Sequence, residues 1–376
     1  MNIRIAVFSS AIVLMLATAW LVYNSDVRRP LFEDHGEVNI VRGPMIQIGD
    51  TDGRTAMVIA WRTNRKSKGY IDYGPSAQYG HRISETEPRL RHALVLSGLH
   101  PNSHYYYRIV NGERIMAQAV FQTGKTADRP IRFSVFGDSG SGSGRQARLA
   151  ELIGKYAPDF IVHTGDVVYW DGKDEDYPAK FYVPYQKLLD RIPMFPVLGN
   201  HDVMTANGQA WLDNFVLPGN ERYYRFDYGN ISFVALDANN ADQASADWLE
   251  RALIDSKQQW KIAYFHIPPF SNRKGRQGNL AARARWVPLL ERYGVDLVFC
   301  GHDHMYTRYH RHNGIYYIVE GLGGYSRQEI NPDAENVEVT SNQEYGFGLV
   351  DVAGRQLTFK HITELGQVLD SLVINK

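Results

Sequence analysis

Apolar and polar residues alternate over short runs from residue 38 to residue 123, and turn residues separate the runs. No segment of this region has helical spacing. The runs predict strands at 57–63, 69–74, 92–99, 105–110 and 119–123. Leu99-His100-Pro101 followed by Tyr105 is typical of a tyrosine corner, and Trp61 stands mid-strand, where a sandwich core residue would lie. The pattern therefore predicts an all-β sandwich over residues 37–124.

After a polar, proline-ended linker the pattern changes to apolar runs that alternate with helical spacing. Strands are predicted at 131–137, 159–165, 195–200, 231–237, 261–266, 296–302 and 315–321. Helices are predicted at 145–156, 246–255 and 283–294, and a β-rich tail at 345–374. We expect a second domain over residues 130–376, of the α/β class with β-sheets flanked by helices.

The N-terminal segment, residues 1–30, has a different composition. An apolar run, Ile5–Tyr23, follows Arg4 and is close to the roughly 20 residues that span a bilayer. Ala17-Thr18-Ala19 resembles a signal-peptidase site, but cleavage there would leave Trp20-Leu21-Val22 at the new terminus. The segment is a signal peptide or, by a slight preference, an uncleaved anchor. We expect an exported protein, periplasmic or extracellular, that meets a membrane only through this segment.

Composition narrows the range of partners. Lys+Arg and Asp+Glu are equal at 41 each, which argues against nucleic acid as the main partner. The single cysteine, Cys300, excludes an intrachain disulfide, and its place at the end of the apolar run DLVFC predicts a buried small side chain.

Polar side chains follow five of the predicted strands. They are Asp138; Asp166 with Tyr169; Asn200-His201-Asp202; His266; and His302-Asp303-His304. Ligands of α/β sheets gather outside the carboxyl ends of the strands, so we expect these five groups to meet. Buried carboxylates and imidazoles are costly unless they are satisfied, and metal coordination satisfies them. Their number and mixture of oxygen and nitrogen donors predict two metal ions, the arrangement that supports in-line phosphoryl displacement.

The series GD, GDxxY, GNHD, H and GHxH resembles the calcineurin-like metallophosphoesterases, and GDxxY resembles their purple acid phosphatase branch. The stretch GPMIQIG…MVIAWRT…YG…L-x-P…Y is similar to the fibronectin type III-like domain that precedes the catalytic domain in plant-type and many bacterial members. The resemblance implies a βαβαβ metal-binding core. It also implies hydrolysis of a small phosphate monoester by in-line attack of a metal-bound hydroxide.

The resemblance also implies roles for individual residues. It implies a first, ferric ion held by Asp138, Asp166, Tyr169 and His304. It implies a second ion, divalent Fe, Zn or Mn, held by the bridging Asp166 together with Asn200, His266 and His302. His201 is implied to stay unligated and to contact the phosphate or protonate the leaving oxygen as the catalytic acid. Asp202 is expected to orient His201.

Two departures from the family pattern carry information. Many members have D-x-H in the first motif, whereas this chain has Asp138-Ser139-Gly140. The first site would lack a ligand unless Tyr169 supplies it, as the resemblance implies. The family often has a further histidine roughly ten residues after the position of His266, and this chain has none. Phosphate binding could pass to Arg273, Lys274 or Arg276, or these residues form only a solvated basic loop.

The sequence is also compatible with other functions. The same metal core serves phosphodiesterases and nucleotidases, and a non-catalytic surface protein could bind through the sandwich. The interpretation as a dinucleotide-binding oxidoreductase depends only on the match of residues 142–147 to G-x-G-x-x-A. No suitable ribose-binding acid follows this motif. The sequence does not choose the natural substrate, the second metal, the pH optimum or the oligomeric state.

Overall fold

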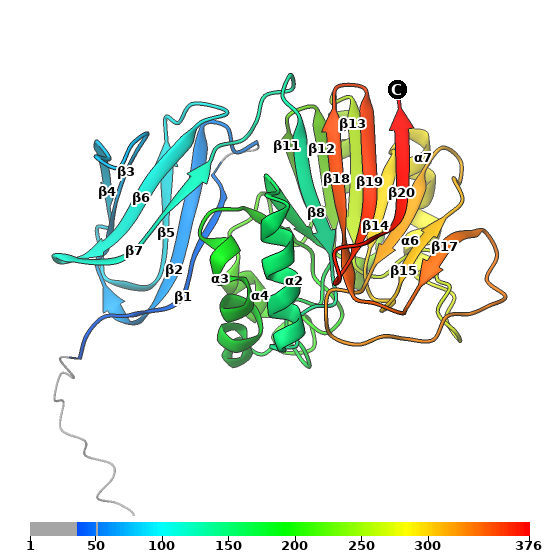
Figure 1. Cartoon of the computed structure of the whole chain (residues 1–376), viewed down its shortest axis with the longest axis horizontal. Helices are drawn as coiled ribbons and strands as arrows, with labels where there is room; N and C mark the ends of the chain where they lie inside the picture. Colours follow the sequence, from blue (N-terminus) through cyan, green and yellow to red (C-terminus); the bar gives the residue numbers. More distant parts are fainter. Residues whose placement is uncertain (1–35, 50–51) are drawn as a thin grey trace, which may run out of the picture. The chain divides into compact units, whose positions relative to one another are not determined.

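The computed structural model describes residues 36–49 and 52–376 (Figure 1). The predicted signal or anchor at 1–30 lies outside these residues, so it stays a prediction. In the described part of the chain, no helix is long and apolar enough to cross a membrane.

The first part of the described chain is all β. A three-stranded sheet has the order β1 (Ile40–Ile48), β2 (Ala56–Ser67), β5 (Arg89–Ser97). A four-stranded sheet has the order β4 (His81–Ser84), β3 (Tyr70–Gly74), β6 (His104–Asn111), β7 (Arg114–Gln122). All pairings are antiparallel. Antiparallel β-sheets are therefore present in this region, whereas an all-β, fibronectin type III-like domain and its boundaries stay predictions.

Two local predictions in this region are confirmed. Trp61 is buried and stacks on His92 with 4.6 Å between the ring centroids. The Tyr105 hydroxyl accepts a hydrogen bond of 3.0 Å from the His100 amide, which is the tyrosine corner.

The second part contains two mixed sheets. The first has the order β10 (Met194–Pro196), β9 (Phe160–His163), β8 (Ile131–Phe136), β18 (Gly346–Ala353), β19 (Gln356–Thr363), β20 (Val368–Asn375). The second has the order β11 (Tyr224–Tyr228), β12 (Ile231–Leu236), β13 (Trp260–Phe265), β14 (Leu297–Cys300), β16 (Tyr316–Glu320), β15 (Tyr306–Tyr309), β17 (Val337–Ser341). Strands β8, β9 and β10 are parallel to one another, and so are β12, β13, β14 and β16.

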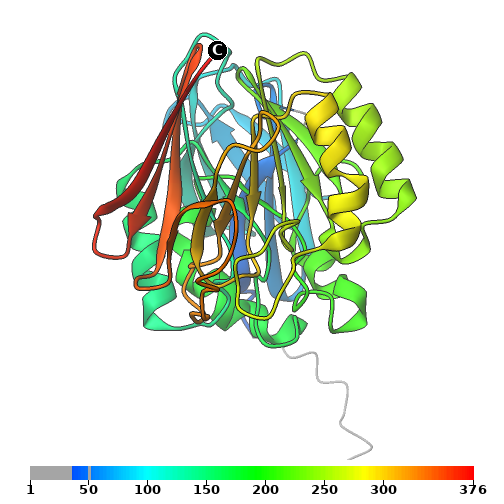
Figure 2. The same cartoon turned by 90° about the vertical axis from the view of Figure 1, so that its right-hand side faces the viewer.

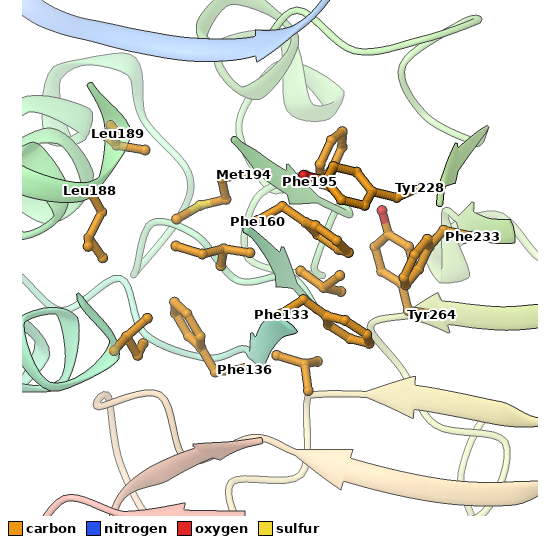
Figure 3. Close-up of a cluster of buried hydrophobic side chains, with 14 of the residues drawn as sticks. Phe133, Phe136, Phe160, Leu188, Leu189, Met194, Phe195, Tyr228, Phe233 and Tyr264 are labelled. Carbon is orange, nitrogen blue, oxygen red and sulfur yellow. The ribbon is translucent and has the colours of Figure 1, made fainter. Parts of the chain in front are cut away.

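Aromatic side chains fill the space between the two sheets (Figure 3). The ring of Phe133 on β8 meets Phe233 on β12 edge to face at 5.3 Å and Phe299 on β14 at 6.4 Å. Phe160 on β9 also contacts Phe233 at 5.3 Å. Such edge-to-face contacts suit the ring quadrupoles and hold the sheets in one register. The strand ends of both sheets are thereby fixed relative to each other.

Helices cover the outer faces of the sheets. The α-helices are α2 (Gly144–Lys155), α3 (Val183–Leu189), α4 (Gln209–Asn214), α5 (Gln243–Ile254), α6 (Leu280–Arg285) and α7 (Val287–Arg292). Short 3-10 or π turns are η1 (Asp174–Asp176), η2 (Pro178–Tyr182), η3 (Ala206–Gly208) and η4 (Ala238–Asn240). Leu249 of α5 and Trp286 belong to the same buried cluster as Phe265 of β13, and Figure 2 shows these helices along one side of the second sheet.

The predicted helices at 145–156 and 246–255 are confirmed by α2 and α5. The prediction of one helix over 283–294 is wrong, because α6 ends at Arg285 and α7 begins at Val287. Pro288 lies in the first turn of α7, where its missing N–H is tolerated but would break the interior of a longer helix.

Charged contacts join the sandwich to the loop before α3 within the compact unit 39–376. The Arg42 guanidinium lies 2.5 Å from one carboxylate oxygen of Asp174 and 2.9 Å from the other, and Arg62 lies 3.1 Å from the same carboxylate. The Tyr107 hydroxyl on β6 donates to the Asp190 carbonyl at 2.9 Å. The segment that follows Tyr169 is therefore tied to the sandwich by several polar contacts.

Candidate metal centre

Three of the predicted ligands leave their strands in a left-handed backbone conformation. Asp138 follows β8 with φ of 58°, Asp166 follows β9 with φ of 55°, and His302 follows β14 with φ of 69°. Few non-glycine residues adopt this conformation, and those that do concentrate at functional sites because surrounding contacts must hold them there. Asp138 and Asp166 both reach the Tyr169 hydroxyl, and the His302 ring lies beside that of His266.

Three side chains, those of Asp138, Asp166 and His304, meet around the Tyr169 hydroxyl. This oxygen lies 3.0 Å from Asp138 Oδ1, 2.7 Å from Asp166 Oδ2 and 3.0 Å from His304 Nε2. His304 Nε2 lies 3.2 Å from Asp138 Oδ1. Neighbouring ligands of an octahedral ion with bonds of roughly 2.1 Å are about 3 Å apart, so this donor spacing fits a first metal ion.

A second group of donors adjoins the first. His266 Nε2 lies 3.3 Å from Asp166 Oδ2 and 3.1 Å from Asn200 Oδ1, and the rings of His266 and His302 are 5.1 Å apart. His266 Nδ1 lies 2.8 Å from the Thr164 carbonyl, an acceptor, so Nδ1 carries the proton and Nε2 faces the site. Asp166 thus stands between both groups, the place of a bridging ligand.

The site is electrostatically suited to cations. Asp138 and Asp166 are buried, and among the residues that the structure describes their ion-pair partners are imidazoles rather than Lys or Arg. Burial raises the pKa of Tyr169 well above its usual value, and the two carboxylates raise it further. Burial alone would lower the pKa of His266, but Asp166 and Asp138 raise it to about 10. Only imidazoles and a phenol surround the two buried carboxylates, so added positive charge would stabilise them. Metal ions would supply that charge.

Gly140 explains why the first motif carries no imidazole ligand. A Cβ atom built there would lie 2.1 Å from the Val167 carbonyl oxygen, so no side chain fits at this position. The Gly140 carbonyl accepts a hydrogen bond of 2.9 Å from the Tyr169 amide. These two contacts hold Gly140 close to the segment from Val167 to Tyr169.

His201 lies at the edge of the ligand cluster. Its ring centroid is 4.6 Å from that of Tyr169, and its amide donates to Asp166 Oδ1 at 2.9 Å. Its Nδ1 lies 2.5 Å from the Trp170 carbonyl, which can only accept, so Nδ1 carries a proton and Nε2 is left for other partners.

The prediction that Asp202 orients His201 is wrong. The buried Asp202 carboxylate accepts hydrogen bonds from the amides of Val167, Val168 and Gly199 at 2.9–3.2 Å. It therefore joins the loop of Asp166 to the loop of Asn200, and the Trp170 carbonyl orients the His201 ring instead.

Comparison with known proteins agrees with this geometry. Residues 131–306 match the family model of the calcineurin-like phosphoesterases. The chain carries a calcineurin-like phosphoesterase domain. Purple acid phosphatase 15 of Arabidopsis thaliana is 31% identical over 285 residues, which cover 62% of this chain and 53% of the plant protein. An uncharacterized protein of Mycobacterium tuberculosis is 25% identical over 375 residues, which cover 81% of this chain and 67% of that protein. The chain thus spans about half to two thirds of the length of these relatives.

A solved structure extends the likeness of the fold. The purple acid phosphatase from yellow lupin seeds superposes with a TM-score of 0.79 at 18% identity, covering 88% of this chain and 74% of the lupin chain. A cover of 88% is more than residues 131–376 can supply, so the likeness includes part of the N-terminal β-sheet region. At this identity the superposition concerns the fold alone.

Of the three basic residues considered for substrate, one faces the phosphoesterase site. Arg276 Nη1 contacts His302 Nε2, and both residues line a pocket of about 260 Å³. Lys274 pairs instead with Glu329 at 2.9 Å on the surface. Arg273 forms an isolated β-bridge with Ile330. Within the described chain no carboxylate is paired with Arg276, so its charge is available to an anion at the site.

Sequence reasoning missed three residues of the segment after β16. Ser326 Oγ lies 2.5 Å from His304 Nδ1, and the Gln328 side-chain oxygen accepts from the His304 amide at 2.9 Å. Tyr325 stacks on Tyr169 with 3.7 Å between the ring centroids, and its amide donates to the Asp138 carbonyl at 3.0 Å. The sequence did contain a signal for this segment: the glycine-rich turn GLGG follows an apolar run, as glycines follow the strands that carry the predicted ligands. Here the polar residues lie after the turn rather than within it.

Several residues that are close to the candidate ligands along the chain have structural roles. His163 is buried with its Nε2 2.9 Å from Ser139 Oγ, and Cys300 is buried and free, as predicted. Tyr306 and Arg308 both bind the Asp370 carboxylate, at 2.6 and 2.7 Å, which ties the histidine loop to β20.

Proposed function

We propose that this phosphoesterase is a bimetal acid phosphatase that hydrolyses phosphate monoesters. The observation that carries the proposal is the donor set in which a tyrosine hydroxyl, two carboxylates and an imidazole lie about 3 Å apart. Three oxygens and one nitrogen favour a hard ion such as Fe(III). The adjoining position has more imidazole and would take divalent Fe, Zn or Mn.

The chain's own residues would divide the reaction between them. Two bound cations would lower the pKa of a water molecule and neutralise the charge that develops on the phosphate. The His201 imidazole, held at Nδ1 by the Trp170 carbonyl, would deliver a proton from Nε2 to the leaving oxygen. Arg276, on the side of His302, would bind the phosphate oxygens through its guanidinium.

Export and domain organisation belong to the same proposal. We infer that residues 1–30 direct the protein out of the cytoplasm and that residues 37–124 form a fibronectin type III-like domain before the catalytic domain at 130–376. Support comes from the apolar run 5–23 and from the three-stranded and four-stranded antiparallel sheets of residues 40–122.

Colour and metal content test the metal assignment. Purified protein should contain two metal ions per chain and show a visible charge-transfer band from Tyr169 to Fe(III), giving a purple or pink solution. Tyr169→Phe should abolish the band. Tyr177→Phe is a matched control, because the Tyr177 hydroxyl is also buried but has no hydrogen-bond partner among the residues that the structure describes. A colourless wild-type protein with two divalent ions would refute the ferric assignment.

Turnover of p-nitrophenyl phosphate and bis(p-nitrophenyl) phosphate tests the reaction. We expect the monoester to be preferred and Asp166→Asn to lose most of the activity, since Asp166 lies between both metal positions. A clear preference for the diester would replace the proposal with a phosphodiesterase. Unchanged turnover in Asp166→Asn would exclude the bimetal mechanism.

A further inference from the structure

Trp170 is an exposed tryptophan next to the candidate acid of the site. Its side chain is 57% exposed, although tryptophan is usually well buried. Its ring centroid lies 4.4 Å from that of His201, with 62° between the planes. An apolar surface of this size beside a catalytic imidazole is available to a ligand.

The position of Trp170 is fixed by its neighbours. Tyr169 packs into the ligand cluster through its hydroxyl, and Lys180 Nζ contacts the Tyr169 carbonyl. The Trp170 carbonyl holds His201 Nδ1 at 2.5 Å. Tyr325, stacked on Tyr169, lies 6.1 Å from the indole. Trp170 and Tyr325 therefore form an aromatic wall on the His201 side of the centre.

The aromatic wall and Arg276 contact different histidines of the site. Arg276 contacts His302, whereas Trp170 contacts His201. In the proposed reaction Arg276 binds the phosphate oxygens and His201 protonates the leaving oxygen, so the leaving group would meet the wall. This step rests on the proposed function.

We infer that Trp170 and Tyr325 select phosphate monoesters whose leaving group carries a flat ring close to the ester oxygen, as in aryl and arylmethyl phosphates. The indole lies in direct contact with His201, so the ring must begin within one or two bonds of the oxygen that receives the proton. A nucleotide places its ribose there and its base farther away, which makes it a weaker match. Offset or edge-to-face contact with an indole gives a planar ring an advantage over a saturated ring of equal size.

Binding of two phosphonates to the metal-loaded full chain tests this inference without turnover. Benzylphosphonate and cyclohexylmethylphosphonate carry the same charge and ring size, and only the first ring is flat. Calorimetry should show benzylphosphonate bound about 2- to 10-fold more tightly by wild type. Trp170→Ala should bring the ratio close to one, and Trp170→Phe should keep part of the preference.

Val183→Ala is a control for the loss of an exposed apolar side chain, since Val183 is 69% exposed at the start of α3. It should leave the ratio as in wild type. If wild type binds both phosphonates equally, or if Trp170→Ala keeps the wild-type ratio, the inference is overturned.

Hydrolysis of benzyl and cyclohexylmethyl phosphate separates this inference from the proposed function. Both are esters of alkanols, so leaving-group basicity contributes little to the comparison. A Trp170-dependent benzyl preference in kcat/KM supports both proposals. Failure to hydrolyse either ester would refute the phosphatase assignment, while a Trp170-dependent preference in phosphonate binding would still support the aromatic wall.

Discussion

Replacing Asp202 by asparagine tests how the two ligand-bearing loops are held together. One carboxylate oxygen accepts from the amides of Val167 and Val168, and the other accepts from Gly199 and Val167. Asparagine keeps one oxygen and places an NH₂ group at the other, so at least one buried amide loses its acceptor. An orphaned buried donor costs about 1–3 kcal/mol, and the remaining bonds weaken by roughly 1 kcal/mol because their acceptor is neutral.

A smaller effect opposes this loss. Burial raises the pKa of Asp202 to about 7, and the charge of Asp166 raises it in the same direction. A neutral amide removes that repulsion and so offsets part of the cost. We expect a net loss of roughly 1–3 kcal/mol in the free energy of unfolding, together with weaker metal retention.

Urea unfolding at pH 7, followed by tryptophan fluorescence, measures the first effect, and chelator competition measures the second. Asp351→Asn is the matched control: Asp351 forms an exposed pair with Arg132 at 2.7 Å, and losing such a pair costs less than about 1 kcal/mol. If Asp202→Asn matched wild type in both unfolding free energy and metal retention, Asp202 would not be the link between the loops.

Three further predictions concern other parts of the molecule. Ser326→Ala removes the partner of His304 Nδ1 and should weaken metal retention about 10- to 100-fold in chelator competition; unchanged retention would show that the contact does not orient His304. Gly140→Ala forces a Cβ atom to 2.1 Å from a carbonyl oxygen, so we expect a loss of about 1–3 kcal/mol in urea unfolding, and an unchanged midpoint would contradict the close approach. The hydrogen bond from Arg42 lowers the pKa of Asp174 to about 2, so its stabilisation is complete above about pH 4 and is lost as pH falls toward 2. Asp174→Asn should reduce the pH dependence of the melting temperature between pH 4 and 2, and an unchanged slope would argue against this ion pair.

The sequence alone was enough to find the local parts of the site. Strand-end positions, glycine turns and residue types are properties of a few consecutive residues, and they placed Asp138, Asp166 and His304 at the ends of strands. Tyr169 was implied as a ligand by the resemblance of GDxxY to the purple acid phosphatases, and the absence of an imidazole at position 140 strengthened this prediction; its contacts with the other three donors agree with it. The tyrosine corner of Tyr105 was equally local.

Other features depended on packing between distant segments. The donors come from two sheets rather than one: Asp138, Asp166 and Asn200 follow strands of the first sheet, and His266, His302 and His304 follow strands of the second. Aromatic packing between the sheets and hydrogen bonds between their strand ends, such as that from the His302 amide to Asp138, bring these two groups together.

The tertiary structure also decided among residues that the sequence could not separate. Arg273, Lys274 and Arg276 are equivalent as cations on one loop, and only Arg276 contacts a candidate ligand. Asp202 proved to bind backbone amides of two loops, and Trp170 proved to be exposed beside His201. The order of residues along the chain determines which types of side chain lie at the end of a strand. The direction and burial of each side chain depend on contacts across the fold, because those contacts set the dielectric, the partner and the access of every group.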